Sequence, residues 1–133
     1  MTTKTSHRAI GEGLIAGMRE KDIEAVLALM HPELVVIEPE SLPYGGTWNG
    51  REGFAELLER LMSFGELSIH ESKIHETDDG LVMEFEISFT SHKDGEVFRT
   101  TAVEVDRVED GLVKEIDIFY KDVAATNEFF ARQ

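Results

Sequence analysis

The second half of the chain repeats one turn signal, and this repeat limits the fold more than any other feature. Asp-Gly occurs at 79–80, 94–95 and 110–111, each time between runs that alternate or are rich in β-forming residues. Asp-Gly suits two-residue hairpin turns because both central positions tolerate positive φ. The sequence therefore predicts an antiparallel meander. Its four strands span about 66–77, 81–92, 96–109 and 112–120.

The first half has the periodicity of helices instead. Residues 50–63 repeat apolar side chains at i, i+3, i+4, i+7 and i+8, which predicts an amphipathic helix. Asn49 and Glu52 stand in the N-x-x-E relationship of a capping box at its start. The other predicted elements are a first helix bearing Ile10, Leu14 and Met18, a helix at 23–30 capped by Asp22, a strand at 34–37, and a short helix or tail at 122–133.

Helices followed by a curved antiparallel sheet make an α+β fold, in which the helix at 50–63 packs on the apolar face of the meander. That face bears Met83, Phe85, Ile87 and Phe89, which share one side of their strand by alternation. A twisted sheet wrapped around helices leaves a conical hollow wherever side chains do not fill it. The same four side chains therefore fit two interpretations, the floor of a pocket or ordinary core.

The stretch PESLPYGGTWNGREGF at 39–54 is unusual because it places two large aromatic residues on a flexible backbone. Tyr44 and Trp48 would form the entrance of the pocket if space remains between the helices and the sheet. In the alternative, both rings cover the helix–sheet junction, and Gly45 and Gly46 permit the turn. The two interpretations differ only in whether the layers enclose a cavity.

A chain of 133 residues suits one domain, 1–133. Cysteine is absent, which rules out disulfides, zinc thiolates and thiol catalysis. The net charge of −14, without a local Lys/Arg cluster, disfavours nucleic acid as a partner. No apolar run approaches the roughly 20 residues of a membrane span and the N-terminus lacks a signal-peptide core, so we expect a cytoplasmic protein without a membrane partner. The five histidines lack metal-ligand spacing, and no metal or cofactor is predicted.

Three segments carry a family resemblance. They are HPELVVIEP at 31–39, YGGTWNGREGF at 44–54 and DGLVKEIDIFYKD at 110–122. Their order resembles that of the SnoaL-like domains of the nuclear transport factor 2-like superfamily, over nearly the whole chain. The resemblance implies a cystatin-like cone, in which N-terminal helices pack in a strongly curved, mostly antiparallel sheet. It leaves the activity open, because the superfamily includes isomerases, cyclases, epoxide hydrolases, dehydratases and non-catalytic binding domains.

Glu38 is the residue that the resemblance singles out. In the related ketosteroid isomerases, a carboxylate directly before a proline at the end of the first strand shuttles the proton, and Glu38-Pro39 matches it. An apolar pocket would raise the pKa of this carboxyl group, which suits a general base near neutral pH. The oxyanion donors of the isomerases match less well, because Leu14 stands at the tyrosine position and the aspartate position falls near Val103 or Glu104. A base without such donors loses the larger electrostatic contribution.

Two other constellations of the superfamily place polar groups elsewhere. The arginine and aspartate of the epoxide hydrolases fall on Phe85 and Ile87, and the last-strand aspartate shared with the polyketide cyclases falls on Phe119. All three residues are apolar in this chain. Asp117 lies two residues before Phe119 and on the same face by alternation, so a shifted acid/base aspartate is an open alternative.

These residues support two functional hypotheses. The first is a cofactor-independent enzyme of the isomerase or cyclase type that acts on an apolar ketone or polycyclic substrate, with Glu38 as general base and Tyr44 or Asp117 as hydrogen-bonding partner. The second is a non-catalytic ligand-binding or dimerisation domain. The resemblance also implies a homodimer formed through the outer face of the sheet, and the expected ligand is small and apolar. The predicted ligand-binding side chains are Leu14, Met18, Tyr44, Trp48, Phe54, Met83, Phe85, Ile87, Phe89 and Phe119.

Overall fold

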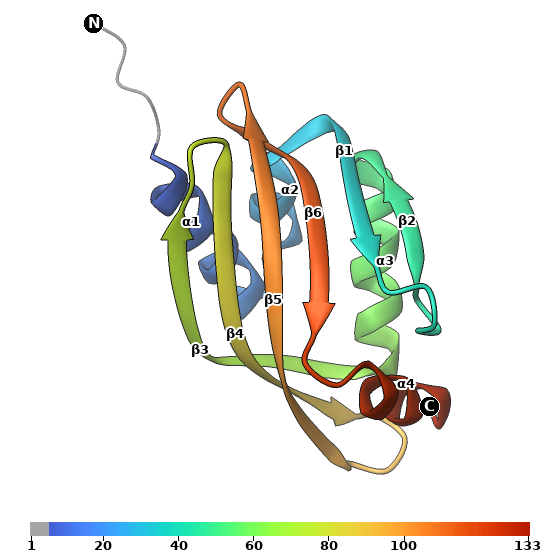
Figure 1. Ribbon diagram of the computed structural model, residues 1–133. Coiled ribbons are helices and arrows are strands. Elements are labelled where there is room, and N and C mark those ends of the chain that lie inside the picture. Colours follow the sequence, from blue (N-terminus) through green and yellow to red (C-terminus); the bar gives the residue numbers. More distant parts are fainter. Residues whose placement is uncertain (1–5) are drawn as a thin grey trace, which may run out of the picture.

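The computed structural model describes residues 6–133, which form one curved sheet with helices packed against it (Figure 1). The predicted domain 1–133 therefore has its first five residues outside the described part. The elements are α1 (His7–Glu20), α2 (Ile23–Ala28), β1 (Met30–Glu38), β2 (Gly46–Asn49), α3 (Gly50–Phe64), β3 (Gly65–Glu76), β4 (Gly80–Ser91), β5 (Val97–Glu109), β6 (Leu112–Tyr120) and α4 (Val123–Ala131). No helix among the described residues is long and apolar enough to cross a membrane.

The predicted meander is confirmed, and each of its strands begins and ends within about one residue of its expected position. β3 to β6 pair antiparallel in sequence order. The sheet continues beyond β6 with β1, which pairs parallel to β6, and with β2, which pairs antiparallel to β1. The whole sheet is therefore mixed, with the order β2-β1-β6-β5-β4-β3, and it is not closed into a barrel.

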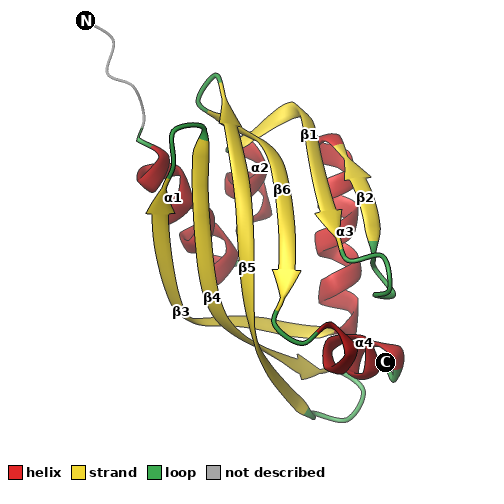
Figure 2. Cartoon of the chain, viewed as in Figure 1, coloured by secondary structure: helices red, strands yellow, loops and turns green. Residues whose placement is uncertain are grey.

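The helices α1, α2 and α3 lie against one face of the sheet, which we call the inner face (Figure 2). On β4 this face carries alternate apolar side chains that are all buried, namely Leu81, Met83, Phe85, Ile87 and Phe89. Phe54, Leu57 and Leu58 of α3 are buried as well, so the predicted packing of this helix against the meander is confirmed. Burial of such side chains supplies the main stabilisation of the fold, at roughly 25 cal/mol per Å² of apolar surface.

Three predictions about the segments on either side of β1 were wrong, namely the end of α2, the connection at 46–49 and the capping of α3. The helix predicted at 23–30 ends at Ala28, because the chain from Met30 onwards already pairs with β6. Residues 46–49, expected as a connection, form the edge strand β2. Asn49 precedes α3 but makes no side-chain capping bond. The chain enters this helix directly from β2 through Gly50, whose φ of 74° only glycine adopts at low cost.

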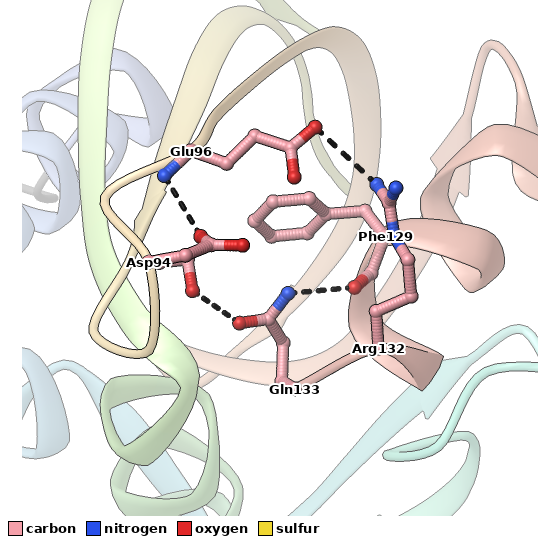
Figure 3. Close-up of polar contacts among 6 residues, drawn as sticks. Asp94, Glu96, Phe129, Arg132 and Gln133 are labelled. Atoms are coloured by element: carbon pink, nitrogen blue, oxygen red, sulfur yellow. Dashed lines mark hydrogen bonds and ion pairs between the residues drawn. The ribbon is translucent and has the colours of Figure 1, made fainter.

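The C-terminal helix α4 closes one end of the space between α3 and the sheet (Figure 1). Phe129 and Phe130 are buried, and the Phe130 ring meets Tyr44 and Phe89 edge-on at centroid distances of 4.9 and 4.7 Å. Polar contacts hold the end of the helix to the β4–β5 turn (Figure 3). They include an ion pair between Arg132 and Glu96, a hydrogen bond from Ser91 to Gln133, and one from the Gln133 amide to the Phe129 carbonyl.

Candidate functional site

A small cavity lies between the inner face of the sheet and helices α1 and α3. Its volume is about 90 Å³. Most of its wall is apolar, with contributions from Leu14 and Met18 of α1, Phe54 of α3, and Phe85 and Ile87 of β4. Three lining side chains carry ionisable groups, namely Glu38, Glu104 and Tyr120. A mostly apolar hollow with a few convergent polar groups is typical of a small-molecule site.

Strand alternation at the end of β1 turns Glu38 into this cavity. Leu34, Val36 and Glu38 point inward and are buried, whereas Val35 and Ile37 between them are only partly buried. β1 lies between β6 and β2, so the carboxyl group is enclosed by the sheet on both sides. Glu38 retains only 2% of its surface exposed to solvent. A carboxylate in such a place needs a hydrogen-bond partner or a proton.

Glu38 accepts a hydrogen bond from the nearer of two tyrosine hydroxyl groups in series, which we call the relay. The hydroxyl of Tyr120, the last residue of β6, donates to Glu38 Oε1 at 3.2 Å. The hydroxyl of Tyr44 in turn donates to the Tyr120 hydroxyl at 3.0 Å. Tyr44 reaches this position from the connection between β1 and β2, where Gly45 packs so closely that a Cβ atom would lie 2.2 Å from the Pro39 carbonyl oxygen.

These surroundings raise the pKa of the Glu38 carboxyl group into the neutral range. The pKa of its carboxyl group is raised from 4.5 to about 8, chiefly by burial, while the hydrogen bond from Tyr120 lowers it and the charge of Glu104 raises it. Burial also raises the pKa of the Tyr44 and Tyr120 phenols, so both remain protonated donors. A carboxyl group with such a pKa can both accept and release a proton near physiological pH.

Two further acids lie on the inner face of β5, Glu104 partly buried and Asp106 buried, and the sequence patterns gave little sign of this pair. Glu104 lines the cavity and Asp106, two residues further on, is 2% exposed. Burial raises the pKa of Glu104 to about 7 and the pKa of Asp106 well above its ordinary value. The pattern V-E-V-D at 103–106 suggests that the valines face inward and the acids face solvent, because apolar side chains normally occupy the core. The pairing of β5 with β4 instead places both acids on the inner face.

The register with β4 was the signal that could have found this pair. Met83 is opposite Glu104 and Leu81 is opposite Asp106, and both β4 residues lie on the apolar face that was recognised from the sequence. Residues directly opposite in an antiparallel pair share a face, so the two acids must also point inward. Of the two positions considered for the second oxyanion donor, the structure places Glu104 and not Val103 at the cavity.

Six of the predicted ligand-binding side chains line the cavity, and four do not. Those that line it are Leu14, Met18, Phe54, Phe85, Ile87 and Phe89. Met83 is fully buried core beyond it. Phe119 is 52% exposed on the outer face, and Asp117 shares that face because Ile116, Ile118 and Tyr120 take the inner one. The predicted pocket roles of Asp117 and Phe119 were wrong, because the predicted alignment of β6 was displaced by one residue. Such a displacement exchanges the two faces of a strand.

The predicted entrance at Tyr44 and Trp48 also needs correction. Tyr44 is 1% exposed, and the Trp48 indole donates to the Tyr44 backbone oxygen at 3.0 Å, so both rings cover the helix–sheet junction. An outer groove of about 120 Å³ lies instead between α1, α3 and β3. It shares four wall residues with the cavity, namely Met18, Leu58, Leu61 and Leu67. The outer groove and the cavity are therefore adjacent on this side.

Within residues 6–133, no three or more His, Asp or Glu side chains gather where they could hold a metal ion. The chemistry that the site can perform with its own residues is proton transfer and hydrogen bonding. Glu38 supplies the exchangeable proton position, Tyr120 and Tyr44 orient it, and Glu104 supplies a second carboxyl group across the cavity.

Comparison with known proteins gives both a family and a fold. A sequence profile described as a SnoaL-like domain matches residues 12–116. TerC, whose structure contains co-crystallised polyporic acid, is 25% identical with a TM-score of 0.82, over 96% of this chain and 99% of TerC. A cystatin-like protein from Xanthomonas campestris is 19% identical with a TM-score of 0.86, over 95% and 98% of the two chains. A "putative polyketide cyclase" from Xanthomonas campestris pv. campestris is 17% identical with a TM-score of 0.80, over 94% of each chain.

These structures confirm the predicted cystatin-like α+β fold. No curated protein sequence matches the chain. The family and fold are thus established by the sequence profile and by the solved structures, and the chemistry must be argued from the site itself.

Proposed function

This chain belongs to the SnoaL-like domain family, and on that premise we propose that it binds a small apolar ketone and moves a proton on it, with Glu38 as the general base. The observation that carries the proposal is the state of Glu38. Its carboxyl group is buried at an apolar cavity, accepts a hydrogen bond from Tyr120, and has a pKa of about 8.

The proposed reaction uses only the residues that line the cavity. The Glu38 carboxylate removes a proton from the carbon next to the ligand carbonyl. The electron pair of the broken C–H bond forms the C=C bond of an enolate, and negative charge develops on the carbonyl oxygen. The protonated carboxyl group of Glu104 donates a hydrogen bond to that oxygen, while Tyr120 orients Glu38. Glu38 then returns its proton to the enolate, at the same carbon or at a conjugated one.

The dimensions of the cavity favour a compact ligand. A cavity of about 150 Å³ holds benzene, and the cavity at Glu38 measures about 90 Å³. A polycyclic compound would need the cavity to join the outer groove through movement of the Met18 and Leu61 side chains. The complex of the related TerC with polyporic acid supports a small organic ligand for this chain too. A short acyclic ketone needs the least rearrangement, and a monocyclic ketone needs the cavity to widen towards the outer groove.

Exchange of carbon-bound protons tests the proposal without knowledge of the natural substrate. We expect the protein to accelerate incorporation of deuterium next to the carbonyl of small cyclic ketones in D2O, followed by NMR. The Glu38→Gln variant should lose at least about 100-fold of this rate, the usual contribution of a general base. The rate should be greatest between about pH 7 and 8, between the pKa of Glu104 and that of Glu38, because the form with Glu38 ionised and Glu104 protonated, although a minor one, is most populated there.

Asp117→Asn is the matched control, since Asp117 lies on the outer face and its replacement also removes one negative charge. It should exchange ketone protons at the wild-type rate. Saturation-transfer NMR measures ketone binding in the same samples. Binding without any acceleration of exchange would overturn the catalytic proposal and favour the alternative, a non-catalytic ligand-binding domain.

We further propose that the protein is a homodimer that associates through the outer face of its sheet. Phe119 is 52% exposed on this face, opposite Val103 of β5. Exposed apolar side chains on a helix-free sheet face are typical of an interface. Sedimentation velocity should give twice the chain mass of 15.0 kDa, and a monomer at micromolar concentration would contradict the proposal. The cytoplasmic location expected from the sequence stays a prediction.

A further inference from the structure

Three carboxyl oxygen atoms on the inner face of β5 have no hydrogen-bond donor within the described part of the chain, residues 6–133. They are Glu104 Oε1 and both side-chain oxygens of Asp106. None of the ion pairs among residues 6–133 includes either residue. Buried polar atoms without partners are rare in native proteins, and each one calls for an explanation. Here the explanation is a proton, because a carboxyl group becomes a donor only when it is protonated.

Among residues 6–133, the strands that flank Asp106 offer it no polar partner. Its cross-strand neighbours are Leu81 on β4 and Ile116 on β6, which are apolar and buried. On the far side of Glu104, the ionisable groups that face the cavity are Glu38 of β1 and Tyr120 of β6, neither of them cationic. The α1 side chains that line the cavity, Leu14, Ile15 and Met18, are apolar. Two adjacent carboxylates cannot both stay ionised in such a place, so at least one retains its proton.

We propose that Asp106 is a positioning residue, which keeps its proton and donates it in a hydrogen bond to Glu104 Oε1, so that the other Glu104 oxygen is turned to the cavity. The contact satisfies the orphaned oxygen of Glu104 and one oxygen of Asp106. It also explains why a second acid lies behind the first, where it cannot touch a ligand itself. The role in catalysis rests on the proposed function, whereas the hydrogen bond does not depend on it.

The proposal predicts how the two carboxyl groups titrate. Asp106 should keep its proton through neutral pH, because burial and the neighbouring charge of Glu104 both raise its pKa. The hydrogen bond from Asp106 lowers the pKa of Glu104, against the larger effect of burial. Removing the donor should therefore move the Glu104 midpoint upwards. Removing Glu104 should move the Asp106 midpoint downwards, since both the charge and the contact disappear.

Carboxyl 13C NMR of the full chain, labelled at the side-chain carboxyl carbons of Asp and Glu, measures these midpoints without a substrate. We expect Asp106→Leu to raise the Glu104 midpoint by at least about one pH unit. Asp106→Asn keeps an N–H donor and should leave that midpoint near its wild-type value. Should Asp106→Leu not fold, Glu104→Leu, which removes both the charge and the acceptor, provides the independent measurement, with the Asp106 midpoint expected to fall by at least about one pH unit.

An Asp106 carboxyl group that titrates near pH 4 in the wild type would overturn the proposal. Equal Glu104 midpoints in Asp106→Leu and Asp106→Asn would do the same. The ketone exchange assay adds a functional readout, in which Asp106→Leu should lower kcat with little change in KM and Asp106→Asn should restore it. Normal titration shifts without any exchange activity would leave the contact established and reject only the proposed reaction.

Discussion

Replacing Glu38 with glutamine should make the protein more stable at pH 8, by roughly 2 to 4 kcal/mol in the free energy of unfolding, and change it little at pH 4. One pKa unit corresponds to about 1.4 kcal/mol, and the pKa of Glu38 rises from 4.5 to about 8 on folding. Below pH 4.5 both the folded and the unfolded state carry the proton. As the pH rises towards 8, only the unfolded state releases it, so the wild type loses stability across this window.

Urea denaturation at pH 4, 6 and 8 measures the effect. Glutamine keeps an oxygen that can accept from Tyr120, so the relay survives, while the buried amide nitrogen offsets part of the gain. Glu86→Gln serves as the matched control, because Glu86 is exposed on the outer face of β4. A stability difference between Glu38→Gln and wild type that is the same at pH 4 and pH 8 would show that Glu38 is not held protonated by burial.

The second large effect concerns the aromatic cluster that α4 forms with Tyr44, Phe64 and Phe89. Replacing Phe130 with alanine should lower the free energy of unfolding by about 3–5 kcal/mol, as for other buried phenylalanines. Phe130 is 1% exposed and its ring packs edge-on against Tyr44, Phe64 and Phe89. Its removal leaves a void that these rings can fill only by moving, and Tyr44 carries the first hydroxyl of the relay to Glu38.

Val97→Ala is the control for this substitution, since Val97 belongs to the same end of the sheet but is 55% exposed. It should cost less than about 1 kcal/mol. Urea denaturation compares the two variants with wild type. A loss below about 1 kcal/mol for Phe130→Ala would mean that α4 is not an integral part of the core, and the contacts in Figure 3 would then be insufficient to hold it.

Much of the architecture followed from local patterns in the chain. The Asp-Gly turns and the two-residue alternation located β3 to β6, and the 3.6-residue period located α3. Such patterns are readable because the side chains that define them are neighbours within one element or one hairpin. Glu38 could be singled out for a similar reason, because its place before Pro39 at the end of a buried run is a local feature.

The composition of the site depended on contacts between distant segments. The insertion of β1 beside β6 brings Glu38 and Tyr120 together across 82 positions of sequence, and Tyr44 joins them across 76. The faces of β5 and β6 were likewise set by their register with neighbouring strands. A shift of one residue there exchanges Tyr120 for Phe119 and Glu104 for Val103.

Short-range periodicity and turn signals thus located α3 and the strands β3 to β6, and the resemblance to the ketosteroid isomerases singled out Glu38 as the first reactive candidate. Tertiary structure alone decided that three acids and two phenols lie at buried or partly buried positions between the helices and the sheet. Strand pairing over long sequence separations selects which side of each strand faces the helices. These groups are Glu38, Glu104, Asp106, Tyr44 and Tyr120. Removal from water then raises the pKa values of these groups, and this effect cannot be predicted from an isolated segment because it depends on the packed surroundings.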